Sequence, residues 1–339
     1  MPAELLTVRD LSLSFTTEGG VAHVLDSVSL SLMPGEIMGL VGESGCGKTS
    51  FARAVLGTLP ANAELRAARM RFGGEDLLRL DAATAADRVR GRAITFIPQD
   101  PFSSFNPLFT IGDQIRELMR WKSPDRTPGE RHYARSRRRA DRARVLAMLR
   151  AVQLPSPERI LRKYPHELSG GQRQRVMIAM ALMPEPRLII ADEPTTALDV
   201  TIQAQILKLL RGLATERGVS VLFTTHDLGT AWEICDRISV MYAGQTLETA
   251  PVEAFFRQPM VPYTRLLLES LPTRCAGLRG IPGEVPKLMD PPPGCSFHPR
   301  CPNATALCAA RYPEPVEQDA GHVVRCHYPV LQRMAVVPA

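Results

Sequence analysis

Residues 168–172 read LSGGQ and stand where a helical pattern of apolar residues begins. Ser169 is a typical helix-capping residue, and Gly170, Gly171 and Gln172 follow it. The amino end of a helix presents backbone N–H groups, which bind anions. The segment therefore predicts an anion-binding helix start, although a capping serine is also common at helices that bind no ligand.

Two acidic residues follow a short apolar run farther along the chain. Residues 188–191 are apolar and bounded by turn signals, which predicts a buried strand, and Asp192 and Glu193 come directly after it. Ligands of α/β proteins bind at the carboxyl edge of the sheet, so both carboxylates are expected at that edge. Two acids there could hold a metal ion and activate a water molecule.

A glycine-rich loop lies nearer the amino end of the chain. Residues 42–50 read GESGCGKTS, between a predicted buried strand at 36–41 and a helical pattern that runs to residue 56. The pattern G-x-x-x-x-G-K-T between a strand and a helix indicates a phosphate-binding loop. Lys48 would supply a charge near the β- and γ-phosphates, and Thr49 would offer its hydroxyl to Mg²⁺. The predicted nucleotide-binding residues of the loop are Gly42, Ser44, Gly45, Cys46, Gly47, Lys48, Thr49 and Ser50.

Three further residues stand at the ends of predicted strands. Gln99 follows the strand predicted at 93–98 and could bind Mg²⁺ or water, although it could also be an ordinary polar loop residue. His226 follows the strand predicted at 219–225, where a neutral imidazole could contact a γ-phosphate or orient water. Phe15 is either an ordinary strand aromatic or a flat surface on which a base stacks.

The elements that must position these residues form an α/β pattern. Alternating apolar and polar runs at 5–15 and 23–32 predict an antiparallel hairpin. Residues 66–92 read as a mixed polar segment with one helical stretch. Further buried strands are predicted at 238–242 and 245–249, and helical patterns at 110–167, 201–216 and 252–270.

Composition and charge limit the class of protein. The chain has 339 residues, which suggests two domains or one large domain with an appendage, and 45% of the residues are hydrophobic, which is ample for a core. No apolar stretch is long enough to span a bilayer and no export signal is visible, so the chain is expected to remain in the cytoplasm. The net charge of +6 would suit nucleic acid, an anionic membrane or a nucleotide. The basic block at 135–144 is interpreted as a solvated helix face, because no aromatic residue interleaves with it.

Four of the seven cysteines crowd a proline-rich tail that begins near residue 272. Cys295, Cys301, Cys308 and Cys326 are spaced C-x5-C-x6-C-x17-C, a poor match to the common zinc patterns. Four thiolates suit either zinc or an iron–sulfur cluster, and four reduced cysteines without a metal are the alternative. Cys235 and Cys275 are interpreted as structural.

These motifs, with ALD at 197–199, occur in an order that resembles the ATP-binding subunits of ABC transporters. The resemblance implies an α/β fold of the P-loop NTPase type, with a mixed-sheet core, an antiparallel β subdomain and a helical subdomain. It implies these roles: Phe15 stacks on adenine, residues 42–49 are the Walker A loop, Gln99 is the Q-loop, residues 168–172 are the signature, Asp192 is the Walker B acid near Mg²⁺, Glu193 is the general base and His226 is the switch histidine.

Longer phrases, such as IPQDPFSSFNP and the cysteine-containing tail, are similar to the oligopeptide and dipeptide permease ATPases. This narrower resemblance implies an ABC ATPase domain at 1–270, with its helical subdomain at about 100–185, and a small Cys- and Pro-rich C-terminal domain at 271–339. In this branch the cysteine spacing is associated with a [4Fe-4S] cluster, which is the expected cofactor of Cys295, Cys301, Cys308 and Cys326, with Zn²⁺ as the alternative.

In this family two ATPase domains dimerise head to tail, so the signature of one closes on ATP held by the other. The resemblance implies an ATP- and Mg²⁺-dependent ATPase that powers peptide import through two separate transmembrane permease subunits. A second ATPase subunit, identical or paralogous, and an extracytoplasmic solute-binding protein would complete the system, and the chain would lie on the cytoplasmic face of the inner membrane. Nickel or another small solute is an alternative cargo, and a regulatory metal site in the tail is a further possibility. A soluble ABC ATPase acting on nucleic acid or ribosomes is the alternative of another class, although no nucleic-acid partner is expected.

Overall fold

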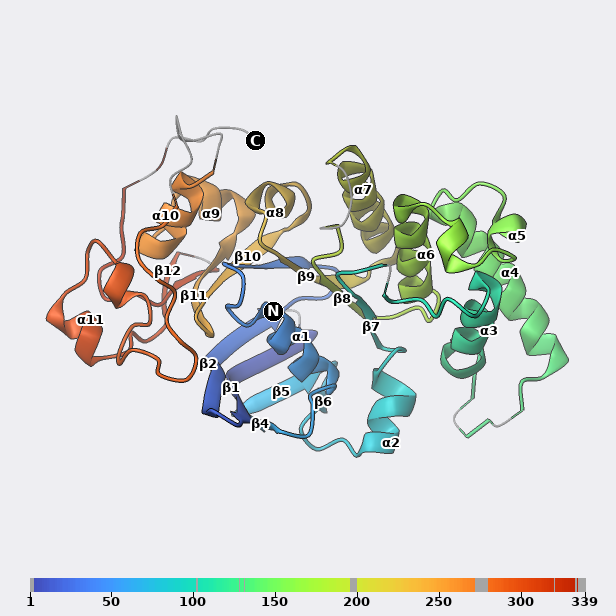
Figure 1. Cartoon of the computed structure of the whole chain (residues 1–339), viewed down its shortest axis with the longest axis horizontal. Coiled ribbons are helices and arrows are strands. Elements are labelled where there is room, and N and C mark those ends of the chain that lie inside the picture. Colours follow the sequence, from blue (N-terminus) through green and yellow to red (C-terminus); the bar gives the residue numbers. More distant parts are fainter. Residues whose placement is uncertain are drawn as a thin grey trace. The chain divides into compact units, whose positions relative to one another are not determined.

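The computed structural model of the chain describes residues 3–101, 103–127, 129–130, 132–195, 200–271, 280–319, 321–332 and 334; its elements are shown in Figure 1. Contacts within the chain divide it into two compact units. The first consists of residues 1–78 and 224–339, and the second of residues 79–223. The boundary predicted near residue 271 adjoins residues 272–279, which, with Cys275, lie outside the described residues.

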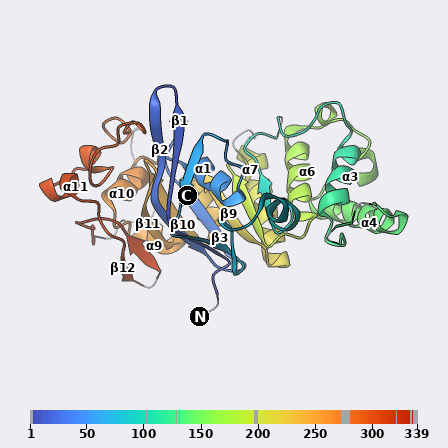
Figure 2. The same ribbon diagram turned by 90° about the horizontal axis from the view of Figure 1, so that it is seen from below.

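An antiparallel sheet forms one part of the first unit. Its strands are β1 (Leu6–Thr17), β2 (Gly20–Leu32), β4 (Ala63–Arg66), β5 (Arg69–Phe72) and β6 (Glu75–Asp76). β1 and β2 pair along their whole length, which confirms the predicted hairpin, and Figure 2 shows them as a long pair. β4 and β5 pair with β1, and β6 pairs with β5. The mixed polar reading of residues 66–92 missed β5 and β6, because strands of 4 and 2 residues are too short to show a period.

A mixed sheet forms the other part of the first unit. Its strands are β3 (Ile37–Val41), β10 (Arg237–Tyr242), β11 (Gln245–Pro251), β12 (Val316–Asp319) and β13 (His322–Val324). β10 is parallel to β3, whereas β11, β13 and β12 follow it in antiparallel pairing. The predictions for β3, β10 and β11 are confirmed. The tail therefore adds two strands, which the sequence did not predict, at the side of β11.

Short helices accompany this sheet, and α11 and η3 among them lie in the tail. They are α1 (Lys48–Leu56), α8 (Leu228–Ile234), α9 (Val252–Arg257), α10 (Pro262–Glu269), α11 (Ala306–Ala310) and the 3-10 turn η3 (His298–Arg300). The helical patterns before residue 57 and between residues 252 and 270 are thereby confirmed. Cys235, which ends α8, is buried, and a Cβ added to Gly39 of β3 would lie 2.9 Å from its sulfur. The cysteine thus fills space that the absence of a side chain at Gly39 leaves open.

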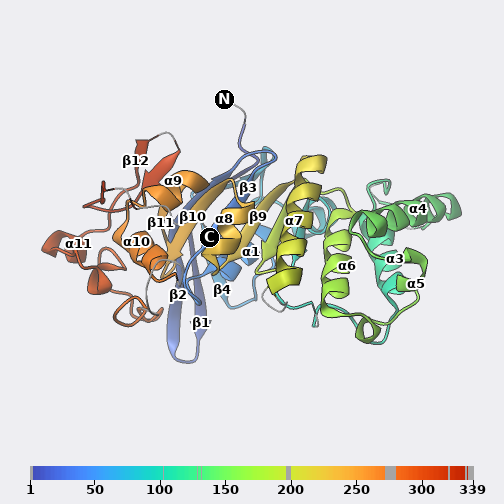
Figure 3. The same cartoon turned by 90° about the horizontal axis from the view of Figure 1, so that it is seen from above.

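The second unit contains three strands and a group of helices. The strands are β7 (Ile94–Ile97), β8 (Leu188–Asp192) and β9 (Ser220–Thr225); β7 is parallel to β8, and β9 lies on the other side of β8. The helices are α2 (Ala82–Thr84), the π-helix η1 (Ala85–Val89), α3 (Ile111–Lys122), α4 (Arg135–Ala151), α5 (Pro157–Ile160), η2 (Pro165–Glu167), α6 (Gly170–Leu182) and α7 (Val200–Arg217). Figure 3 shows α3, α4, α5 and α6 side by side. None of the helices in the described ranges combines the length and the apolar character that crossing a bilayer requires.

The basic block at 135–144 forms the start of α4, but it is more than a solvated face. Arg137 is buried and makes ion pairs with Glu130, at 3.1 Å, and with Asp141, at 3.8 Å. Asp141 is also buried and accepts hydrogen bonds from Ser123 and from Tyr133. The i,i+4 spacing of Arg137 and Asp141 places both on the inner face of the helix. The solvated-face interpretation is therefore wrong for these two residues.

Candidate functional site

The glycine-rich loop lies between β3 and α1, and two of its glycines are required by close contacts. Gly42 has φ 155°, and a Cβ there would lie 2.2 Å from the carbonyl oxygen of Met241. Gly47 has φ 107°, and a Cβ there would lie 2.6 Å from Leu25 Cδ2. Only glycine fits both the left-handed backbone and the space. The loop can therefore follow a path that turns backbone N–H groups toward one point.

Lys48 begins α1 and is buried within the loop. Its ammonium group donates to the carbonyl oxygens of Gly42, at 2.8 Å, and Glu43, at 3.3 Å. Gly47 gives α1 no side-chain cap, and the first turn contains no acidic residue. A helix start of this kind, with a lysine in the loop, offers a favourable electrostatic environment to a phosphate group.

Cys46 is buried in the same loop, with its sulfur 3.9 Å from Lys48 Nζ. Burial raises the pKa of the Cys46 thiol, although the charge of Lys48 acts in the opposite direction. The thiol is therefore neutral near pH 7, and a neutral thiol is a poor nucleophile. Cys46 fits the loop as a small side chain.

The LSGGQ segment forms the start of α6. Ser169 Oγ accepts a hydrogen bond from the N–H of Gln172, at 3.3 Å, and Gln172 Oε1 accepts one from the N–H of Ser169, at 3.2 Å. Leu168 is buried and Ser169 is exposed. A Cβ at Gly171 would lie 3.1 Å from Ile202 Cγ2 of α7, which explains the small residue there. The capped helix start that the sequence predicts is confirmed, and its serine faces solvent.

Gln99 and Glu193 come together at the ends of β7 and β8. Gln99 Nε2 donates to Glu193 Oε2 at 3.1 Å. Asp192 is the last residue of β8 and is buried, whereas Glu193 is half-buried and has φ 45°. A left-handed backbone at a non-glycine residue is strained and occurs often at functional sites. The sharp turn after Asp192 directs the Glu193 carboxylate toward Gln99.

Phe15 and His226, the remaining predicted site residues that the structure describes, lie in the first unit. Phe15 is half-buried on β1, opposite Ala22 of β2 and Ala63 of β4. His226 is exposed directly after β9, and Asp227 caps α8 by accepting from the N–H of Gly229. Residues 197–199, the ALD motif, lie outside the described residues. The first unit thus carries the phosphate loop, Phe15 and His226, and the second carries Gln99, the two acids and the LSGGQ helix.

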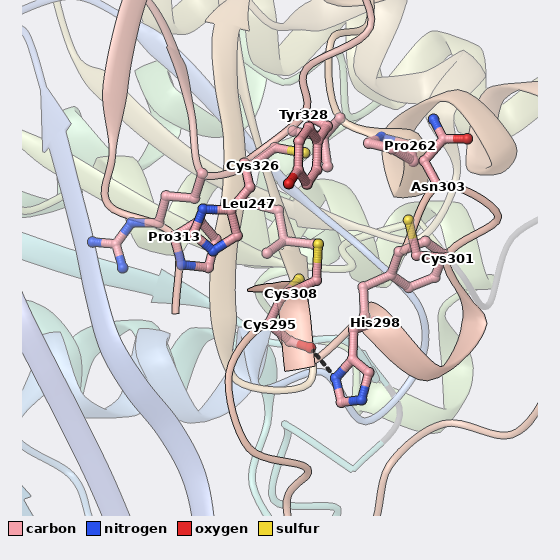
Figure 4. A pocket seen from close by; sticks show the side chains of 14 residues that line it. Leu247, Pro262, Cys295, His298, Cys301, Asn303, Cys308, Pro313, Cys326 and Tyr328 are labelled. Carbon is pink, nitrogen blue, oxygen red and sulfur yellow. Dashed lines mark hydrogen bonds between the residues drawn. The ribbon is translucent and has the colours of Figure 1, made fainter. Parts of the chain in front are cut away.

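The four tail cysteines line one pocket, as Figure 4 shows. The other side chains around it are mostly apolar or aromatic, and the four cysteines are free thiols. Burial raises the pKa of Cys295, of Cys301 and of Cys326, the last to about 11, and neighbouring thiols act in the same direction. Across the described residues, no three His, Cys, Asp or Glu side chains are arranged to hold a metal ion. The donor set fits a thiolate-bound centre chemically, but its present arrangement is not that of a single-ion site.

The structure adds two contacts of the phosphate loop that the sequence did not predict. Glu43, the second residue of the loop, forms an ion pair with Arg300 at 2.9 Å, and its N–H donates to the hydroxyl of Tyr263 at 3.2 Å. No local sequence pattern predicts contacts between residues that are so far apart in the chain. The available signals were an acidic residue inside the glycine-rich loop and an arginine directly before Cys301.

Known proteins share both the folded core and the tail. Residues 25–196 match the family described as ABC transporter, and residues 247–308 match the family described as oligopeptide/dipeptide transporter, C-terminal region. The chain is 43% identical over 327 residues to the dipeptide transport ATP-binding protein DppD of Bacillus subtilis, covering 95% of this chain and 94% of that protein. It is 43% identical over 326 residues to the oligopeptide transport ATP-binding protein OppD of Mycobacterium tuberculosis, covering 95% of this chain and 51% of that one.

A solved structure of an ATP-binding cassette has a similar fold. The dimeric post-hydrolysis state of the ATP-binding cassette MJ0796 bound to ADP and Pi superposes with a TM-score of 0.60 and 27% identity. The superposition covers 73% of this chain and 98% of that one.

Proposed function

Because this chain belongs to the ABC transporter family, we propose that it is the ATP-hydrolysing subunit of an importer of dipeptides and oligopeptides. The observation that carries this proposal is the glycine-rich loop, whose glycine conformations and buried lysine support nucleotide binding. The match of residues 247–308 to a peptide-transporter region favours peptides over nickel or another small solute.

We propose that the residues of the loop bind the phosphates and that Phe15 stacks on the adenine. Lys48 would supply positive charge to the β- and γ-phosphates, and its burial makes that charge more effective than it would be in water. Phe15 lies on the antiparallel sheet of the same unit as the loop, with its ring half-buried and available to a base. Mg²⁺, with Thr49, Asp192 and Gln99 as its proposed ligands, would neutralise charge on the phosphate oxygens.

Glu193 is the proposed general base of hydrolysis. Its carboxylate accepts a hydrogen bond from Gln99, so its orientation is fixed before a water molecule is bound. Removal of a proton from the water by this carboxylate makes the oxygen a better nucleophile for the γ-phosphorus. His226 is proposed to contact the γ-phosphate, since it is exposed at the end of β9.

The LSGGQ helix is proposed to serve a second ATPase subunit. Ser169 is exposed and the helix start is fully formed, which suits contact with the nucleotide of a partner. The cassette MJ0796 is dimeric in its solved structure, and this supports a similar pair of identical or paralogous subunits here. We further propose two transmembrane permease subunits, a solute-binding protein that acts through them, and a peripheral position on the cytoplasmic face of the inner membrane.

We propose a [4Fe-4S] cluster for the pocket of Cys295, Cys301, Cys308 and Cys326. Four thiols on one apolar pocket support this, and a cluster is wider than one ion, so its ligands stand farther apart than those of Zn²⁺. Iron, sulfide and zinc should be measured on protein purified without oxygen. Roughly four irons and four sulfides per chain, lost on Cys308→Ser, would support the cluster; zinc or no metal would refute it.

The function is tested by Glu193→Gln in the purified protein. The amide cannot accept the proton, so turnover should fall by roughly 10²-fold or more while the affinity for ATP is kept. Glu216→Gln, an exposed change on α7, is the matched control and should keep wild-type turnover. Cells that lack this chain should also lose uptake of labelled peptides. Wild-type turnover in Glu193→Gln would reject the role of Glu193, and unchanged peptide uptake would reject the transport function.

A further inference from the structure

The acidic residue of the phosphate loop is held by an arginine from the C-terminal tail. Arg300 Nη1 donates to Glu43 Oε2 at 2.9 Å, and Arg300 Nη2 donates to Glu43 Oε1 at 3.3 Å. Both residues belong to the first unit. Two parallel bonds between a guanidinium and a carboxylate give a stronger and better oriented contact than a single bond.

Arg300 is held in place by several contacts in addition to those with Glu43. Its side chain is only 4% exposed, and it also donates to the carbonyl oxygens of Ile281 and Pro282, each at 2.9 Å, and to the hydroxyl of Tyr242 at 3.2 Å. Gly283 has φ +85°, and a Cβ there would lie 2.9 Å from Arg300 Cγ. This is a built contact and differs from the exposed ion pairs that contribute little to stability.

The Glu43 carboxylate needs a positive partner because the proposed ligand of the loop, a nucleotide, is negatively charged. A nucleotide brings several negative charges to the loop, and an unpaired carboxylate at Glu43 would repel them. At an effective dielectric constant of about 20, one such repulsion across roughly 8 Å corresponds to a loss of affinity on the order of 10-fold or more. The Arg300 guanidinium cancels this charge, and its five donor contacts keep it where it does so.

We propose that Arg300 is a positioning residue of the nucleotide site, which holds the Glu43 carboxylate and neutralises its charge. The tail thereby sets the affinity of the loop for nucleotide. The inference rests on the proposed binding of ATP by this loop. It also joins two sites, because Arg300 directly precedes Cys301, and Phe297 both lines the cysteine pocket and stacks edge-on against Tyr242.

The test measures the affinity of the full-length chain for ATP, ADP and AMP. Arg300→Gln should weaken ATP binding on the order of 10-fold, ADP binding less and AMP binding least, because repulsion grows with the charge of the ligand. Adding Glu43→Gln to Arg300→Gln removes the unpaired carboxylate and should return the affinity for ATP to within about 3-fold of wild type. Arg311→Gln, an exposed change in the same tail, is the matched control and should leave all three affinities unchanged.

The outcomes show whether Arg300 acts by neutralising the charge of Glu43 or only by attaching the loop to the tail. An equal loss for the three nucleotides, without rescue by Glu43→Gln, would overturn the proposal, as would unchanged affinity in Arg300→Gln. If Arg300→Gln does not fold, Glu43→Gln alone decides: it should bind ATP at least as tightly as wild type, and binding weaker by more than about 3-fold would overturn the proposal. Failure of the wild-type chain to bind any nucleotide would instead reject the proposed function.

Discussion

Replacing His322 by alanine should destabilise the first unit by about 3 kcal/mol. His322 Nε2 lies 2.7 Å from Glu248 Oε1, and the two side chains are 2% and 0% exposed. The carboxylate also accepts from the N–H groups of Met260, at 2.7 Å, and Val261, at 3.0 Å. Leaving a buried hydrogen-bonding group without its partner costs about 1–3 kcal/mol, and the cavity left by the imidazole ring adds to the loss. A value of about 3 kcal/mol lies at the upper end of that range.

Urea unfolding followed by circular dichroism measures this difference. The midpoint should fall while the dependence on urea stays the same, which indicates a change in stability alone. Adding Glu248→Gln to His322→Ala should recover part of the loss, because a buried neutral amide costs less to leave without its partner than a buried carboxylate does. His327→Ala is the control, since His327 is half-buried and its contacts, a hydrogen bond with the carbonyl oxygen of Arg311 and an edge-on ring contact with Tyr328, involve no buried carboxylate. Equal midpoints for His322→Ala and His327→Ala would refute the reasoning.

Two further predictions concern the phosphate loop. Gly47→Ala should reduce the affinity for ATP by roughly 10-fold or more, since its Cβ would meet Leu25 Cδ2 at 2.6 Å on a left-handed backbone. Gly212→Ala on α7 is the control and should not reduce it, because nothing lies within 4 Å of a Cβ at that position. Equal affinities of the two variants in a titration with labelled nucleotide would contradict this prediction. Because burial raises the pKa of Cys46, iodoacetamide should modify Cys46 more slowly in the native chain than in the urea-denatured chain at pH 8, as measured by mass spectrometry. The raised pKa of the Cys46 thiol favours the folded state at low pH, and that contribution to stability is lost as pH rises through the pKa of the folded state. If iodoacetamide modified Cys46 at the same rate in the native and the denatured chain, the thiol would not be protected.

Local patterns were sufficient for much of the fold. The hairpin of β1 and β2, the strand before the phosphate loop and the capped start of α6 each depend on residues that are close in sequence. Gly42, Ser169 and Asp192 could be predicted as site residues because they stand in short motifs with fixed spacing. The same is true of β8, whose five residues are all buried and apolar up to the final aspartate.

Contacts between distant segments could not be predicted in this way. β13 has three residues, and its place beside β11 depends on pairing between residues 248 and 324, which no local period records. Arg300 and Glu43 are 257 positions apart, and Arg137 looked like any other arginine of a basic block until Asp141 was found beside it. The position of a charge in the sequence does not say whether it becomes buried, because burial is decided by what packs over it.

The composition of the first unit has a consequence for the way the chain is made. Residues 1–78 leave the ribosome long before residues 224–339, yet both segments belong to one compact unit. β3 cannot pair until β10 has been made, and Glu43 cannot form its ion pair until Arg300 has been made, so the phosphate loop reaches its final state only after residue 300 has left the ribosome. Pairings between such distant segments slow folding and leave strand edges open in the meantime. We expect nascent chains that stop before residue 224 to associate with chaperones, and we expect the loop to become protected from proteases only after residues 224–300 have left the ribosome.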